Sequence, residues 1–600
     1  MRFVRLGLII LTLVVVIGGY NWRAFRNLST QEAMDMAQVG RNLAEGKGYT
    51  TLFIRPLSIY LVKKHNREKP AGGMFADRAQ LKRMHPDLAN PPVYPTLLAG
   101  AMKVLPFQYK LPARPKPSFW TTSKGAFYRY EPDFLIALLN QALFLVLIFL
   151  IFLLARRLFD RSVAWLSAIL VLATELFWHF SVSGLSTILL MLIFVGLVWS
   201  LAFVEEQVRT PQWGTGAVLL LAGLAGACVG IGCLTRYAFG WLILPVLGFL
   251  ALFGGPRRVS LVLIALVVFG VVTTPWLLRN LSLSGTPFGT ATYALLEDTF
   301  LSPGSKLQRS LEPDLTRISL LPFWIKLMTN LRPIVQNDLP KLGGSWITAL
   351  FLAGLLIGFR NPATRRVRYF LLFCVPVLII AQALGRTQLS EDSPEINSEN
   401  LLVLLAPIVV VYGVALFFIL LDQIKLPMSE LRYMIIGLFG VVVSLPMILI
   451  FLPPRMSAVT SPYDPPRIQL VADWLRPSEL CMSDVPWAMA WYGERQSVWL
   501  TLKATADASD PNTHEDFISI NDYEKPIAAL YLTPRTMDAR FFSEWIAAGE
   551  MSWGSFILDC LVKKEIPPTF PLHKMMRYWL PTGQIVLTDW DRWRKARETE

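Results

Sequence analysis

The sequence predicts an α-helical protein that crosses a membrane about eleven times and carries a small α/β domain at its C-terminus. Three observations predict this fold class. Of the 600 residues, 54% are hydrophobic and only 17% are charged. The mean hydropathy is +0.45. The apolar residues gather in eleven separate stretches, and a more polar segment follows the last one. One soluble core cannot absorb so much apolar sequence, and disorder requires low hydrophobicity.

The eleven apolar stretches are the predicted membrane spans. A helix needs about 20 apolar residues to cross the hydrocarbon layer, and the stretches at 239–254 and 346–359 are short for this. The first stretch lacks a small-x-small cleavage site after it, so we interpret it as a signal anchor. In order, the stretches are 3–20, 134–155, 162–180, 186–204, 215–234, 239–254, 259–278, 346–359, 368–384, 400–421 and 432–452.

Basic residues in the short loops predict the orientation. Cytoplasmic loops are enriched in Lys and Arg, and five basic segments fall on one side when the spans alternate. We therefore expect a multi-pass protein of the plasma (inner) membrane with a cytoplasmic N-terminus and an extracytoplasmic, periplasmic C-terminal domain. The residues concerned are Arg2 and Arg5; Arg156, Arg157 and Arg161; Arg257 and Arg258; Arg360, Arg365, Arg366 and Arg368; and Lys425 and Arg432.

This topology divides the chain into two predicted units. Residues 1–452 form a transmembrane module with a first outer loop at 21–133, and residues 453–600 form the outer α/β domain. In that domain, residues 468–475 have a helical pattern, and residues 497–500 and 528–532 have extended patterns. Its two cysteines, Cys481 and Cys560, either form one disulfide or stay unpaired.

The formal charge of +14 is concentrated partly in the first outer loop, where residues 21–131 hold 18 Lys and Arg against 7 Asp and Glu. Nucleic acid is not an expected partner on the outer face of a membrane. The expected partners of this basic surface are anionic membrane lipids or a lipid-linked phosphate.

Two acids open a predicted helix just beyond the first span. Ser29 or Thr30 can cap this helix, and Glu32 and Asp35 lie three residues apart, on one helical face. One interpretation is that the acids only complement the helix dipole. The other is that a carboxylate at the membrane surface acts as a base or metal ligand for a lipid-borne substrate.

Several motifs appear in a fixed order along the chain. They are Glu32 with Arg41-Asn42-Leu43 and Glu45-Gly46-Lys47-Gly48-Tyr49, Pro91-Pro92-Val93-Tyr94-Pro95, Leu234-Thr235-Arg236, Pro275-Trp276-Leu277-Leu278-Arg279-Asn280, and Pro486-Trp487 with Ala490-Trp491-Tyr492. Together they resemble the motifs of membrane glycosyltransferases with the C-type fold (GT-C). The similar families are the family-39-like protein mannosyltransferases, the lipid A aminoarabinose transferases and the rhizobial lipopolysaccharide glycosyltransferases.

The resemblance implies an enzyme that moves a sugar from a polyprenyl-phosphate donor to an envelope acceptor, which is a lipid, a glycan or a protein, on the outer face. It also implies that an acid in the first outer loop is the catalytic base. Alignment on Arg41 places Glu32 at that position. The family usually has Asp there, often as Asp-Glu, whereas this chain has Gln31-Glu32, so the base remains open between Glu32 and Asp35.

Arginines near the outer ends of spans are candidates for binding the donor phosphate. Arg279 and Arg236 can make bidentate phosphate contacts, or they can serve as interfacial and structural residues. We find no Gly-x-Gly-x-x-Gly motif after a strand, and a polyprenyl-phosphate donor needs no nucleotide-binding domain.

A metal ion is not required by the pattern, but a divalent cation is a possible cofactor. Glu175 and His179 lie four residues apart, which suits a metal site, a proton relay or a simple polar pair. His85 in the first loop is a further possible ligand, together with its neighbours His65, Asp77 and Asp87.

Two other functions are compatible with many spans and intramembrane charges. One is a transporter or flippase of lipid-linked sugars, which inverted repeats would support. The other is a non-catalytic scaffold of an envelope assembly. The large outer segments favour chemistry on one face of the membrane.

Overall fold

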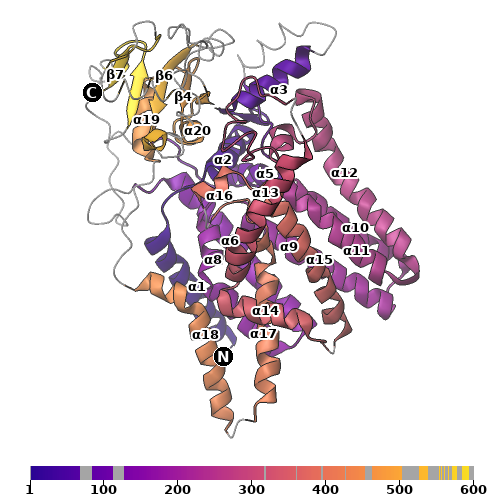
Figure 1. The fold of residues 1–600 in the computed structure, drawn as a ribbon. Coiled ribbons are helices and arrows are strands. Elements are labelled where there is room, and N and C mark those ends of the chain that lie inside the picture. Colours follow the sequence, from indigo (N-terminus) through magenta and orange to yellow (C-terminus); the bar gives the residue numbers. More distant parts are fainter. Residues whose placement is uncertain are drawn as a thin grey trace.

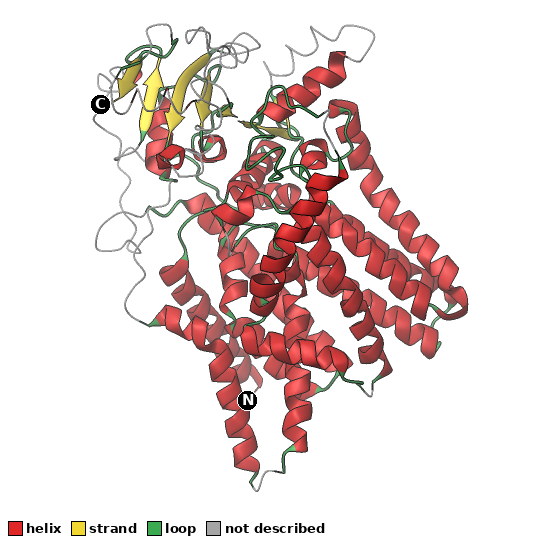
Figure 2. Cartoon of the chain, in the orientation of Figure 1, coloured by secondary structure: helices red, strands yellow, loops and turns green. Residues whose placement is uncertain are grey.

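The computed structural model shows a mostly helical protein with one small sheet region (Figure 2). The structure describes residues 2–67, 84–111, 128–315, 319–359, 361–393, 396–425, 428–452, 463–502, 526–537, 570–576 and 584–593, with 553, 556, 560, 565 and 566. A bundle of long helices forms the body, and the sheet lies at one end of it (Figure 1). The hairpin of α17 and α18 projects at the opposite end.

Eight helices in the described residues are long and apolar enough to cross a membrane, or up to ten if each of two bent pairs counts as one span. A helix forms its backbone hydrogen bonds internally, so helices of this length with apolar side chains suit a lipid environment. The long helices are α1 (Arg2–Ala24), α6 (Glu131–Leu158), α9 (Thr187–Arg209), α10 (Thr215–Cys233), α12 (Arg258–Ser284), α15 (Pro362–Gly385), α17 (Ala406–Gln423) and α18 (Ser429–Phe451).

Three of the eleven predicted spans are not simple straight helices, which corrects the expected number. The stretch 162–180 forms α7 (Arg161–Ala173) and α8 (Glu175–Val182), bent by 53°. The bend lies at Thr174, which is extended and whose hydroxyl donates to the carbonyl of Leu170 at 2.6 Å. The stretch 239–254 is a short apolar helix, Tyr237–Phe253.

The third departure is the stretch 346–359, which contributes α14 (Ser345–Leu356). It forms a pair bent by 103° with the helical segment that begins with α13 (Leu320–Pro333). Hydropathy reports apolar length but not direction, so it could not distinguish a bent pair from a span.

Two of the basic loops meet at the same end of the bundle. Arg157 near the end of α6 pairs with Glu206 of α9. Arg366 at the start of α15 pairs with the neighbouring Glu205, with its Nη1 3.0 Å from Oε1. The ends of three predicted spans that carry these residues therefore lie side by side, as a common orientation requires.

The first outer loop folds into helices that lie on the bundle beneath the sheet. Helix α2 (Gln31–Ala44) is capped by Thr30, whose side chain accepts a hydrogen bond from the amide of Ala33, as its sequence predicts. Gly40 allows α5 (Val93–Val104) to approach closely, since a Cβ there would lie 3.0 Å from the carbonyl oxygen of Pro95. Helix α3 (Pro56–Arg67) and the antiparallel strands β1 (Thr50–Thr51) and β3 (His85–Pro86) complete this part.

The C-terminal segment forms the expected α/β structure, but its sheet also takes a strand from the first outer loop. The strand order is β2-β5-β4-β6-β8-β7, and β2 (Phe53–Ile54) pairs in parallel with β5. The sheet therefore contains strands from both sides of the boundary predicted at 452/453. The other elements are β4 (Leu480–Ser483), β5 (Ser497–Trp499), β6 (Ile527–Leu532), β7 (Lys574–Met576), β8 (Ile585–Thr588), α19 (Pro465–Asp473) and α20 (Pro486–Tyr492).

Helix α11 and several shorter helical turns connect the longer elements. They are η1 (Tyr237–Leu242), α11 (Ile243–Phe253), η2 (Gly255–Arg257), η3 (Gly289–Tyr293), η4 (Ile334–Asp338), η5 (Leu339–Lys341), α16 (Gln388–Asp392), η6 (Leu402–Leu405) and η7 (Pro534–Met537).

No disulfide joins Cys481 and Cys560. Both side chains are buried, and they belong to different hydrophobic clusters. Of the two alternatives for these cysteines, the structure has the one without a bridge.

One buried carboxylate joins the bundle, the first outer loop and the C-terminal domain. Asp133 lies in the first turn of α6 and is fully buried. It accepts hydrogen bonds from the amide of Leu28 at 3.0 Å, from Trp491 Nε1 at 2.8 Å and from the hydroxyl of Tyr492 at 2.7 Å. Because Trp491 and Tyr492 belong to α20, this carboxylate holds α20 in its place next to α2.

Substituting Asp133 is expected to loosen the outer part of the protein. Asp133→Ala leaves three buried donors without an acceptor, and we expect a loss of about 3 kcal/mol of unfolding free energy. Thermal unfolding of the detergent-solubilised protein measures this. Glu131→Gln is the matched control, because Glu131 is exposed in the same turn. Equal midpoints for the two variants would contradict the role given to Asp133.

Asp484 directly follows β4 and bonds to the segment after β6. Because its carboxyl can gain or lose a proton, we expect the stability of the fold to depend on pH. It accepts hydrogen bonds from the amide and the hydroxyl of Thr533, the latter at 2.8 Å. Burial raises the pKa of the Asp484 carboxyl to about 6, although the bonds from Thr533 oppose this. The folded protein therefore binds a proton here more readily than the unfolded chain does, whose Asp pKa is about 3.9.

A carboxyl with a raised pKa stabilises the fold as the pH falls from about 7 towards 4 and loses that contribution as the pH rises through about 6. We expect Asp484→Asn to remove this part of the pH dependence. The measurement is the difference in unfolding midpoint between wild type and variant at pH 5 and at pH 7. A difference that does not change with pH would show that Asp484 does not titrate in this range.

Candidate active site

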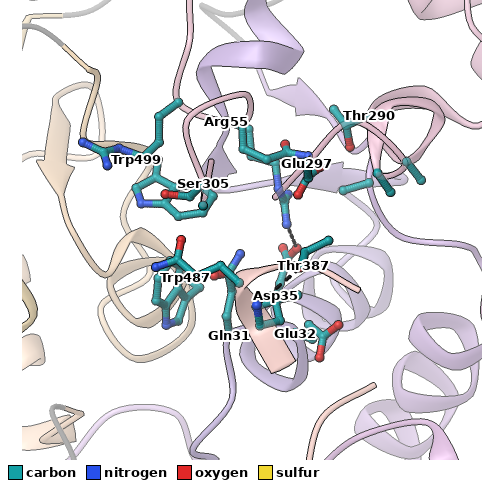
Figure 3. A pocket seen from close by; sticks show the side chains of 18 of the residues that line it. Gln31, Glu32, Asp35, Arg55, Thr290, Glu297, Ser305, Thr387, Trp487 and Trp499 are labelled. Carbon is teal, nitrogen blue, oxygen red and sulfur yellow. Dashed lines mark hydrogen bonds and ion pairs between the residues drawn. The ribbon is translucent and has the colours of Figure 1, made fainter. Parts of the chain in front are cut away.

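A pocket of about 280 Å³ lies where the start of α2 meets the outer loops and the C-terminal domain. Its lining comes from segments far apart in the sequence, and the two sides differ in character. Carboxylates and Arg55 lie on one side, and the rings of Trp487 and Trp499 lie on the other (Figure 3). Glu32 and Asp35, the two acids predicted from the sequence, both line it.

Asp35 is fully buried and is held by one of its two oxygens. Its Oδ2 accepts hydrogen bonds from Arg55 Nη2 at 2.7 Å and from Asn90 Nδ2 at 2.9 Å. Its Oδ1 is buried and has no hydrogen-bond partner. The carboxylate is thus oriented by an ion pair while one acceptor oxygen remains available.

Glu32 lies one turn earlier on α2 and contacts a different segment. Its carboxylate accepts hydrogen bonds from the hydroxyl and, at 3.4 Å, from the amide of Ser398. Burial raises the pKa of Glu32, the bond from Ser398 lowers it, and the charge of Glu399 raises it again. In the described residues no ion pair holds Glu32, and the charge of Arg236 lowers its pKa without reversing the upward shift.

Three further carboxylates line the same pocket, namely Glu399, Glu297 and Asp484, and the sequence analysis proposed none of them as a site residue. Glu399 accepts hydrogen bonds from the amide of Thr387 at 2.9 Å and from two hydroxyls. Glu297 is 8% exposed and accepts a hydrogen bond from the side-chain amide of Gln308. Burial raises the pKa of Glu297 to about 7, while Gln308 and the buried Lys326 lower it. No periodic pattern surrounds Glu297, so the sequence held no signal for it.

Arg55 is the cation that lines this pocket closest to the acids of α2, and it was not predicted. It follows β2 directly, lies 4.1 Å over the ring of Phe53 and pairs with Asp35. Arg309 and Arg535 also line the pocket, and both donate to other groups: Arg309 to the carbonyl of Leu500, and Arg535 to the hydroxyl of Tyr463.

Arg236 and Arg279 do not line this pocket. Arg236 lies behind Glu32, near enough to interact electrostatically with Glu32 and Glu399, and donates to Thr187 at 3.2 Å. Arg279 donates to the carbonyls of Asp87 at 2.7 Å and Tyr49 at 3.1 Å. Its guanidinium also lies 4.6 Å from the centre of the Trp276 ring. These contacts join the first outer loop to α12, and the phosphate-binding role of Arg279 stays a prediction.

The other polar residues predicted as metal or relay candidates are dispersed. Glu175 and His179 contact each other at 3.0 Å, as a polar pair on α8. His85 lies elsewhere, with its Nε2 2.7 Å from the hydroxyl of Ser58. Burial and then Arg55 lower the pKa of His85 to about 4. Asp77 lies outside the described residues, and within them no three His, Cys, Asp or Glu side chains gather as a metal site.

The aromatic wall of the pocket comes from the motif around Pro486-Trp487. Trp487 and Trp499 lie edge to face, with ring centres 5.6 Å apart, and each also contacts Phe53. Rings at these distances attract each other beyond their buried area. The sequence showed this motif, but only the fold brings it opposite the acids of α2.

Comparison with known proteins matches part of the chain to a family and all of it to a fold. Residues 118–278 match the family described as dolichyl-phosphate-mannose-protein mannosyltransferase. No curated protein matches the sequence.

Two solved structures represent the structural similarity. One is ArnT from Cupriavidus metallidurans bound to undecaprenyl phosphate, with 11% identity, a TM-score of 0.53 and 98% of each chain covered. The other is the archaeal oligosaccharyltransferase AglB from Archaeoglobus fulgidus in complex with an inhibitory peptide and a dolichol-phosphate. It has 11% identity, a TM-score of 0.52, and coverage of 97% of this chain and 74% of the other.

The chain therefore has the C-type fold of membrane glycosyltransferases, as its motifs predicted, and within that fold residues 118–278 match the dolichyl-phosphate-mannose-protein mannosyltransferase family.

Proposed function

We propose that this protein is a membrane glycosyltransferase that moves a sugar from a polyprenyl-phosphate donor to an envelope acceptor on the outer face of the membrane. The observation that carries the proposal is the pocket in which Glu32 and the Asp35–Arg55 pair lie together, inside a fold shared with such enzymes. The acceptor is a lipid, a glycan or a protein, because all three present a nucleophile that a carboxylate can deprotonate.

The proposed reaction needs one base and one cation. The acceptor heteroatom attacks the anomeric carbon, and the bond between that carbon and the phosphate oxygen breaks. The proton of the acceptor passes to a carboxylate, and polyprenyl phosphate leaves with the bond electrons. We assign the base to Glu32, because burial raises its pKa and no ion pair neutralises it. The acceptor would replace Ser398 on that carboxylate.

Arg55 is the proposed partner of the donor phosphate, in place of Arg279. Asp35 fixes the position of Arg55 through Nη2, and a planar guanidinium can offer its other N–H groups to phosphate oxygens. Such a preorganised cation stabilises the charge that develops on the leaving group. Arg236 would act indirectly, by its electrostatic effect on Glu32 and Glu399.

The orientation belongs to the same proposal. The sheet lies at the end of the bundle opposite the α17–α18 hairpin (Figure 1), and the pocket lies where α2 meets the domain that carries this sheet. Lys425 and Arg432 flank the turn of the hairpin. The positive-inside rule places such basic turns in the cytoplasm. The pocket would then open on the periplasmic side of the inner membrane, where a polyprenyl-phosphate sugar reaches it within the bilayer.

Removing the proposed base is expected to stop transfer without unfolding the protein. Glu32→Gln should lower kcat by about 10²- to 10⁴-fold, the usual contribution of general-base catalysis. The assay is transfer of radiolabelled sugar from polyprenyl-phosphate donors to an envelope extract. Asp35→Asn is measured in parallel, and Glu175→Gln is the control outside the pocket. Full activity of Glu32→Gln together with an inactive Asp35→Asn would move the base to Asp35.

Substituting Arg55 is expected to weaken stabilisation of the leaving phosphate. Arg55→Lys keeps the charge next to Asp35 but loses the guanidinium fork, so kcat should fall about 100-fold. Lys64→Gln is the control, because Lys64 is an exposed cation of the same loop. Uptake of lipid-linked sugar into sealed vesicles, without any transfer, would instead support a transporter.

A further inference from the structure

A second polar cavity, of about 470 Å³, lies at the opposite end of the α2–α20 pair from the candidate active site. Arg41 in the last turn of α2 and Tyr492 at the end of α20 both line it. Glu32 and Arg41 are nine residues apart on one helix, so the two sites are separated by about 13 Å along its axis. The volume lies in the range of small-molecule sites, and the reaction proposed above makes no use of this cavity.

The walls of the second cavity are built from side chains that bond to one another. Arg41 is 6% exposed. It pairs with Glu45 at 2.9 Å and with Glu494 at 2.6 Å, and its guanidinium lies 3.8 Å over the ring of Tyr109. Gln469 holds the backbone of the segment that carries Tyr109. It donates a hydrogen bond to the carbonyl of Tyr109 at 2.7 Å and accepts one from the amide of Leu111 at 3.0 Å.

The end of α20 determines where Glu494 lies. Glu494 directly follows the C-cap Gly493 and has a φ of +52°, the left-handed conformation in which many helices end. Here it places the Glu494 carboxylate against Arg41 and 3.6 Å from Lys47.

The lining has an excess of positive charge together with groups that recognise sugars. Four lining cations (Arg41, Lys47, Lys110 and Arg495) face two lining acids (Asp473 and Glu494). Glu45 beside the cavity pairs with both Arg41 and Lys47, so the local excess is one positive charge. Lys110 is exposed at the edge of the cavity. Aromatic rings, amides and charged planar groups can hydrogen-bond hydroxyls and cover the apolar face of a sugar ring, while surplus cations favour an anionic ligand.

We propose that this cavity binds an anionic saccharide, a sugar that carries a phosphate or a carboxylate, and that this saccharide belongs to the acceptor. This inference rests on the proposed function, because it makes the cavity the second anchoring point of an acceptor whose reactive end reaches Glu32. The donor phosphate is not its ligand, since that group lies at Arg55 in the other pocket.

Calorimetric binding to the full chain in lipid nanodiscs tests the proposal. The probes are glucosamine 6-phosphate, trigalacturonate and the neutral maltotriose. We expect one or both anionic probes to bind more tightly than maltotriose, and the tighter of the two identifies phosphate or carboxylate as the natural group. Equal or weaker binding of both anionic probes would overturn the proposal.

Charge variants locate the binding. Lys110→Glu should weaken binding of the anionic probe about fivefold, and Asp473→Asn should strengthen it about twofold, as expected for exposed charges. Lys103→Glu is the matched control, because Lys103 is an exposed lysine outside the cavity. Equal effects of Lys110→Glu and Lys103→Glu would show nonspecific electrostatics and overturn the proposal.

The same experiment separates this inference from the proposed function. Binding should be unchanged in Glu32→Gln, because that residue lies in the other pocket. If no donor supports transfer but the binding pattern holds, the glycosyltransferase proposal fails and the saccharide site remains. If transfer occurs and Lys110→Glu alters neither binding nor the KM for acceptor, the saccharide site is wrong and the enzyme remains.

Discussion

The buried carboxylate of Asp133 is the interaction on which the outer half of the protein depends. It accepts hydrogen bonds from Leu28, Trp491 and Tyr492, which belong to the first loop and the C-terminal domain. These bonds hold α20 against α2, and both cavities lie along that helix pair. A charge buried in this way must be fully hydrogen-bonded, so the three partners cannot separate without a large cost in free energy.

The candidate active site concentrates carboxylates that differ in their surroundings. Asp35 is paired with Arg55, whereas Glu32 is bonded only to the uncharged Ser398 among the described residues. An ion pair favours the charged form and burial disfavours it, so two acids on one helical face can perform different tasks. The proposed division into a positioning acid and a proton acceptor rests on this difference and not on their order in the sequence.

Much of the fold could be predicted, because the length of an apolar stretch and the capping of a helix each depend only on residues that are close in the sequence. Thr30 caps α2, the helix at 465–473 and the strands at 497–499 and 527–532 form as expected, and the long apolar stretches become long helices. The bends at Thr174 and before α14 could not be predicted, because their direction depends on packing against other helices.

The sequence by itself determined the helical membrane class, the resemblance to C-type glycosyltransferases and the two acids of α2. Each depends on residues that are close in the chain or on motifs in a fixed order. Only the tertiary structure decided which charges meet. It placed Arg55 on Asp35, used Arg279 to hold backbone carbonyls, and gave the C-terminal sheet a strand from the first loop. These contacts join residues from 20 to more than 400 positions apart, and their energy depends on burial, which no local pattern reports.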